Sequence, residues 1–189
     1  MFADVIKLRM KESLRKTLIL VLLNPVSIIG ALSLYLILGN MDLALSMPPF
    51  NAFIHVRPDH FIINMISCFI LLVPEVNKFS IKQIVVIASL ISIAYFPLQI
   101  ILLLPSAVGL SGFVYFIAVR YIFSRRSKKI LWTSIGIFLF IAEFSSIKNP
   151  DGFAHGVHLI GYVLGLISIK TPLFEHTPKW VRNTFLLPA

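Results

Sequence analysis

Long apolar runs, separated by short clusters of charged residues, constrain this sequence more than any other feature. The runs cover residues 17–38, 60–73, 84–104, 111–123, 130–147 and 153–169. Of the 189 residues, 58% are hydrophobic and only 13% are charged, and the mean hydropathy is +0.91. A soluble domain of this length does not need so much apolar surface. We therefore expect an all-α polytopic membrane protein with six spans, surrounded by a lipid bilayer.

The basic residues predict the orientation of these spans. Fifteen of the 17 lie before the first run, after the second, at the end of the fourth and beyond it, or after the sixth. Only Arg57 and Lys148 lie on the other side, which predicts cytoplasmic N- and C-termini. Because this topology accounts for the net charge of +9, we expect no nucleic-acid partner. Residues 1–16 are either a basic amphipathic segment on the cytoplasmic surface or a helical extension of the first span. Residues 17–170 form the membrane domain, and residues 171–189 form a cytoplasmic tail.

The fourth apolar run, Ser111 to Phe123, is short. Its 13 residues would cover about 20 Å as a helix, less than the roughly 30 Å of a hydrocarbon core. Ser111 should therefore lie below the membrane surface, and the loop before it must be buried in protein or line a wet cavity. The sequence thus predicts a short, buried fourth helix.

Gly109-Leu110-Ser111-Gly112 stands where this helix begins. The glycines allow a sharp turn and the close approach of a substrate backbone. A serine at a helix N-terminus has backbone N–H groups and the positive end of the helix dipole beside it, which suit the oxyanion of acyl transfer. We therefore take Ser111 as a candidate nucleophile, although this motif alone is weak.

Two further spans carry residues with suitable chemistry. His60 and Asn64 are four apart, so they share one face of the second span, where they either act in a site or hold helices together by hydrogen bonds. In the sixth span, His158 lies three residues before Gly161, and Gly161 with Gly165 permits close approach of another helix. If that helix is the fourth span, His158 can meet Ser111 as its base.

Other side chains allow more than one interpretation. Tyr115 lies four residues after Ser111 and either stacks on the His158 imidazole or packs as an ordinary aromatic. Glu143 could be a third catalytic residue, but we favour a structural or gating role. His155 and His158 could bind a metal, yet the spacing is not that of a metalloprotease and Asp151 is the one nearby carboxylate. We therefore expect neither metal nor cofactor, and Cys68, inside an apolar run, is no candidate nucleophile.

Taken together, these motifs resemble the rhomboid family of intramembrane serine proteases. The matching pieces are His60-x-x-x-Asn64, Gly109-Leu110-Ser111-Gly112 with Tyr115, and His158-x-x-Gly161-x-x-x-Gly165, in the second, fourth and sixth of six spans. The resemblance implies a six-helix rhomboid-like bundle, over about residues 55–170, with residues 17–38 as its first span.

The resemblance also implies roles for these residues. Ser111 would be the nucleophile and His158 its general base, a dyad without an acid. His60, Asn64 and the backbone at Gly109 and Ser111 would support the oxyanion. Gly109 and Gly112 would shape the turn, Tyr115 would support His158, and Gly161 and Gly165 would bring the sixth span against the fourth. The substrate would be a transmembrane segment of another protein, which enters past the fifth span.

Some features depart from the family pattern. The loop 39–59 is short and lacks a Trp-Arg pair, and the usual glycines do not flank Glu75. Because of these departures, the motifs do not assign a subfamily or a substrate range. The sequence also does not give the oligomeric state. The competing hypotheses are a rhomboid-like protein that binds membrane clients without cleaving them, and a small transporter, which the absence of an internal repeat disfavours. The expected location is a bacterial plasma membrane.

Overall fold

The computed structural model describes residues 2–55, 57–75, 78–104, 109–123, 129–146 and 155–171, and within these ranges every regular element is helical. The elements are α1 (Phe2–Leu38), α2 (Met41–Ser46), the short 3₁₀ helix η1 (Phe50–Ala52), α3 (Pro58–Glu75), α4 (Ile81–Leu102), α5 (Ser111–Phe123), α6 (Lys129–Ser145) and α7 (His155–Lys170). The all-α class is confirmed.

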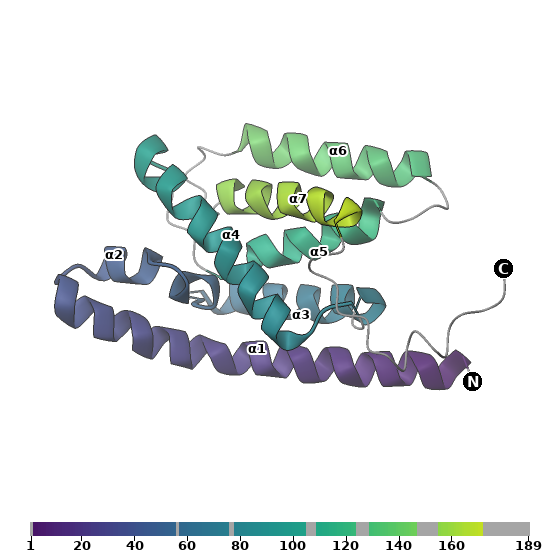
Figure 1. Ribbon diagram of the computed structural model, residues 1–189, viewed down its shortest axis with the longest axis horizontal. Coiled ribbons are helices and arrows are strands. Elements are labelled where there is room, and N and C mark those ends of the chain that lie inside the picture. The colour runs from purple at the N-terminus through teal and green to yellow at the C-terminus, as the bar shows by residue number, and fades with distance from the viewer. Residues whose placement is uncertain are drawn as a thin grey trace.

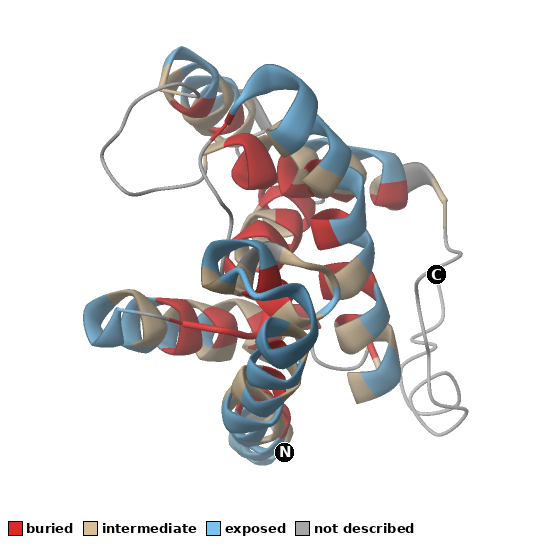
Figure 2. Cartoon of the chain, turned by 90° about the vertical axis from the view of Figure 1, so that its left-hand side faces the viewer, coloured by how far each residue is buried: buried red, intermediate tan, exposed pale blue. Residues whose placement is uncertain are grey.

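The helices pack in the order α1, α3, α5, α7 and α6, and α4 crosses them obliquely (Figure 1). Three described helices are long and apolar enough to cross a membrane, namely α1, α3 and α4, and α5, α6 and α7 are shorter apolar helices. Buried residues gather at the centre of the bundle, whereas the outward faces of the helices are exposed (Figure 2). Apolar side chains on these outward faces are compatible with contact with lipid tails, so they do not require burial against another protein.

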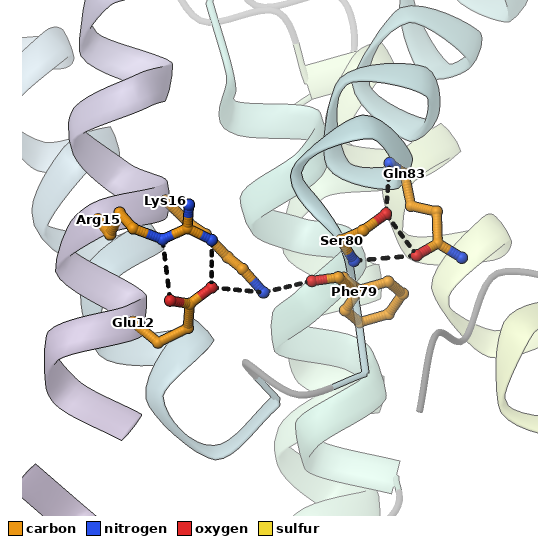
Figure 3. Close-up of polar contacts among 6 residues, drawn as sticks. All are labelled: Glu12, Arg15, Lys16, Phe79, Ser80 and Gln83. Carbon is orange, nitrogen blue, oxygen red and sulfur yellow. Dashed lines mark hydrogen bonds and ion pairs between the residues drawn. The ribbon is translucent and has the colours of Figure 1, made fainter. Parts of the chain in front are cut away.

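Helix α1 decides between the two interpretations of the basic segment 1–16. It runs unbroken from Phe2 to Leu38 with Pro25 inside it, so the segment is a helical extension of the first span. Two side chains fasten this extension to the rest of the bundle: Ser13 Oγ donates to the Phe69 carbonyl at 2.7 Å, and Lys16 Nζ donates to the Phe79 carbonyl. Glu12 pairs with Arg15 and Lys16 beside that contact (Figure 3).

The observed ends of some helices differ from those predicted. Helix α4 begins at Ile81 rather than at residue 84, because Ser80 and Gln83 form a reciprocal capping box (Figure 3). Helix α3 begins at Pro58, a favoured first helical residue, and extends to Glu75 instead of ending near residue 73. The predicted loop 39–59 contains α2 and η1. The predicted bounds of the short fourth helix are confirmed.

The closest helix pair is α5 with α7, and glycines allow it. A Cβ added at Gly161 would lie 2.0 Å from the Gly112 carbonyl oxygen, and one at Gly165 would lie 2.8 Å from the Phe116 carbonyl oxygen. Both distances are far inside van der Waals contact, so no larger side chain fits without moving a backbone. The expectation that Gly161 and Gly165 bring the sixth span against the fourth is confirmed.

A buried ionic cluster joins α3, α5 and α7 near their C-terminal ends. Arg120, 1% exposed, donates to the backbone oxygen and the hydroxyl of Ser168 at 2.6 and 2.9 Å. Its Nε lies 3.7 Å from Glu75 Oε2, and its guanidinium lies over the Phe79 ring. A buried charge needs such partners, so this cluster fixes the relative positions of the three helices that carry the candidate site.

Candidate active site

Ser111 is the first residue of α5 and is 6% exposed. The turn before it depends on Gly109, whose φ of +103° is open to glycine and strained for other residues. Residues between α2 and α3 accept the backbone donors of this turn: Gly109 N–H donates to the Asn51 carbonyl at 2.7 Å, and Leu110 N–H donates to His55 Nε2 at 3.3 Å. The serine therefore enters the helix from a turn whose backbone is held in place.

Of the two interpretations of Tyr115, the structure shows stacking on the His158 imidazole. Their rings are parallel within 5°, with centroids 4.4 Å apart. Tyr115 lies one turn after Ser111 on α5, and His158 lies one turn before Gly161, which abuts Gly112. The imidazole and the serine therefore belong to the same contact between α5 and α7.

A carboxylate from a third helix meets the imidazole. Glu143 of α6, 8% exposed, accepts from His158 Nδ1 at 2.8 Å through Oε2, and its other oxygen accepts the hydroxyl hydrogen of Tyr115. Because a carboxylate only accepts, Nδ1 of His158 carries a proton, and in the neutral ring Nε2 is then the nitrogen that has the lone pair. That tautomer is the one a general base needs when Nε2 faces a hydroxyl.

Sequence reasoning missed His55, which lies between η1 and α3. Its Nδ1 is 3.1 Å from the Phe53 carbonyl, so Nδ1 donates and Nε2 accepts from Leu110 N–H and from the Asn64 amide. Burial lowers the pKa of His55 to about 4, which keeps the ring neutral and Nε2 able to accept. Asn24 of α1 fixes the loop by accepting the His55 backbone N–H at 3.1 Å. The signal available in the sequence was a histidine five residues before His60.

The two predicted residues of α3 also lie at this turn. Asn64 is 4% exposed, and its amide nitrogen donates one of its two hydrogens to His55 Nε2 at 3.1 Å. The rings of His60 and His55 meet edge to face with centroids 5.6 Å apart, and a Cβ at Gly109 would lie 3.3 Å from His60 Cε1. The structure thus gathers Ser111, His60, Asn64, Gly109, Tyr115 and His158 around one turn.

One reason for setting a metal aside was wrong. The sequence offered Asp151 as the nearby carboxylate, and residues 147–154 lie outside the described ranges. Glu143, twelve residues before His155, supplies one instead: its Oε2 lies 2.6 Å from His155 Nδ1 and 2.8 Å from His158 Nδ1. A bundle brings residues of different helices together, which spacing along a single helix does not reveal.

Comparison with known proteins agrees with this arrangement. The family model described as Rhomboid domain matches residues 49–173, more than half of the chain. The chain belongs to the rhomboid family. Curated proteins and solved structures gave no match.

The rhomboid match begins at residue 49 and includes every residue of the site described above except Asn24. It therefore covers Asn51 and His55 as well as the three helices α3, α5 and α7, and it leaves out α1. Membership establishes an integral membrane protein of the rhomboid type. The family also includes inactive members, so membership alone leaves open whether this chain is a protease.

Proposed function

We propose that this rhomboid is an intramembrane serine endopeptidase that cleaves transmembrane segments of other membrane proteins. The observation that carries the proposal is the hydrogen bond from His158 Nδ1 to Glu143, together with the parallel stacking of Tyr115 on the same ring. A histidine that only fills space between helices needs neither a fixed tautomer nor a fixed plane. A general base needs both.

In the proposed reaction, Ser111 Oγ attacks the scissile carbonyl carbon while His158 Nε2 takes the hydroxyl proton. The proton then passes from Nε2 to the leaving amine, and an acyl-enzyme ester remains on Ser111. Water repeats the sequence, with His158 again as base, and releases the new carboxyl terminus. Glu143 keeps the proton on Nδ1 and stabilises the imidazolium that forms in each half of the reaction.

The negative oxygen of the tetrahedral intermediate would be bound at the start of α5. The Ser111 backbone N–H belongs to the first turn of a helix, where the dipole favours an anion. Asn64 has a second amide hydrogen, and His60 lies beside Gly109 at the same turn. Preorganised donors of this kind contribute most where water is excluded, and Ser111 and Asn64 are both buried.

The second candidate function is the binding of membrane clients without cleavage, which inactive family members make a real alternative. The retention of both Ser111 and His158, joined to Glu143, favours the protease. A transporter is disfavoured because the candidate polar residues gather around one turn and do not form a path.

The test is cleavage of a model transmembrane substrate by purified protein in detergent or bilayers. Wild type should cleave, and Ser111→Ala and His158→Ala should each abolish cleavage, because nucleophile and base act as one unit. A fluorophosphonate probe should label Ser111 in wild type and should not label His158→Ala. If folded wild type neither labels nor cleaves any substrate tried, the client-binding function stands instead.

A further inference from the structure

The cluster of Glu143, His155 and His158 has a second chemical capability. We propose that these three side chains form an inhibitory site for Zn²⁺, or a similar borderline divalent cation, and that metal binding switches the protease off. The inhibitory part rests on the function proposed above, whereas the binding part does not.

The donor set fits the metal. It consists of two imidazole nitrogens and one carboxylate oxygen, and the three atoms all lie within 4.8 Å of one another. Tetrahedral Zn²⁺ sites use such ligands at about 2.0–2.2 Å, so neighbouring donors stand roughly 3.3 Å apart. The two imidazole nitrogens now lie 2.6 and 2.8 Å from Glu143 Oε2, so these two edges must each lengthen by about half an ångström to admit the ion. The third edge, between the two imidazole nitrogens, is within 4.8 Å and would adjust by rotation of the histidine side chains.

The surroundings of the cluster favour a cation. Glu143 supplies a negative charge among buried groups, and its second oxygen is already oriented by the Tyr115 hydroxyl. A carboxylate oriented by an outer hydrogen bond is a better metal ligand than a free one. His155 is the least buried of the three, with its side chain 12% exposed, so an ion would reach the cluster past His155. A fourth position would remain for water.

Binding at Nδ1 would stop the proposed reaction by moving a proton. In the metal-free protein Nδ1 of His158 carries the proton and Nε2 holds the lone pair. A metal–nitrogen bond at Nδ1 requires a lone pair on Nδ1, so the proton leaves Nδ1 and the neutral ring carries its one proton on Nε2 instead. Nε2–H cannot accept the proton of Ser111. Inhibition therefore follows from the tautomer and needs no movement of helices.

The binding test uses full-length protein, free of any polyhistidine tag, in detergent micelles. Zn²⁺ affinity is measured by competition with a chromophoric chelator. Wild type should bind one ion, and His155→Gln and Glu143→Gln should each weaken binding by about 100-fold or more, because each removes one ligand. His55→Gln, which removes a described histidine that is not one of the three ligands, should bind like wild type. Mg²⁺ should not compete, since it prefers oxygen ligands.

The inhibition test follows fluorophosphonate labelling of Ser111, with each protein compared with its own metal-free rate. Saturating Zn²⁺ should slow wild-type labelling by about tenfold or more, a chelator should restore it, and His155→Gln should be insensitive. Wild type that binds no Zn²⁺ at roughly 100 µM, or variants that bind it as tightly, would overturn the site. Binding without slower labelling would overturn the switch. If the protein proves inactive, the binding measurement still decides the site.

Discussion

At the scale of single residues, the bond between Glu143 and His158 makes the most specific claim. Glu143 Oε2 accepts from Nδ1 of His158, the proposed base, and Oε1 accepts the hydroxyl hydrogen of Tyr115, which stacks on the same ring. Glu143→Gln keeps the shape but brings N–H groups that compete for Nδ1 and favour the wrong tautomer. We expect kcat to fall by roughly 10- to 1000-fold with KM little changed.

Steady-state cleavage of a transmembrane substrate measures this effect, with thermal unfolding as a check on folding. Glu143→Asp, which keeps the carboxylate on a shorter side chain, is the matched variant and should recover part of kcat. A Glu143→Gln enzyme with full kcat would show that Ser111 and His158 act as a dyad without help from the carboxylate, as the family resemblance implies.

His55 makes a second residue-scale prediction, about pH. Its pKa is about 4 in the folded protein because of burial and about 6.5 when unfolded, so the unfolded state binds more protons between these values. The free energy of unfolding should therefore be highest above about pH 6.5 and should fall as the pH drops towards 4. From pH 7.5 to 5 the loss attributable to His55 is about 2 kcal/mol.

Other histidines titrate in the same range, so the measurement is a difference between two proteins. His55→Gln keeps an acceptor for Leu110 N–H and the Asn64 amide but does not titrate, and its stability should depend less on pH than that of wild type. Thermal unfolding in detergent at a series of pH values gives both curves. Parallel curves would mean that the His55 ring is not held neutral by its surroundings.

At the scale of helices, the contact between α5 and α7 sets the position of His158 relative to Ser111. Gly161→Ala would place a methyl group 2.0 Å from the Gly112 carbonyl oxygen, which one backbone must move to avoid. We expect a loss of about 3 kcal/mol or more in unfolding free energy, and activity should fall with it.

Gly30→Ala in α1 is the matched control. Its added methyl group would meet the Phe50 ring at 2.6 Å, a side chain that can rotate away, and alanine gains up to about 1 kcal/mol of helix propensity over glycine. Its stability should stay near that of wild type. If the Gly161→Ala protein were as stable and as active as Gly30→Ala, the close contact between α5 and α7 would not be what positions His158 relative to Ser111.

Helices and their contacts were predictable from the sequence to different degrees. The apolar runs predicted the helices, and the spacing of Gly161 and Gly165 predicted a close partner, because both signals depend on residues near one another in the chain. The capping box at Ser80 shifted one helix start by three residues. His55 and Glu143 gain their partners only through the packing of segments that are distant in sequence. The sequence offered a histidine five residues before His60 and a carboxylate in the fifth span, but it could not show which side chains they contact.

At the scale of the whole molecule, the orientation in the membrane decides whether the proposed site can work. In the predicted six-span topology, 15 of the 17 basic residues share one side with both termini, which predicts that this side is cytoplasmic. Ser111, at the opposite end of α5 from Arg120, then opens to the outer side, where water can reach it.

A reporter fused after Ala189 should be active only in its cytoplasmic form, and one inserted at Asn149 only in its external form. Arg57→Gln with Lys148→Gln removes the two outer basic residues and should leave this pattern unchanged. An external signal after Ala189 would turn the site towards the cytoplasm, and substrates would then have to be cleaved on that side.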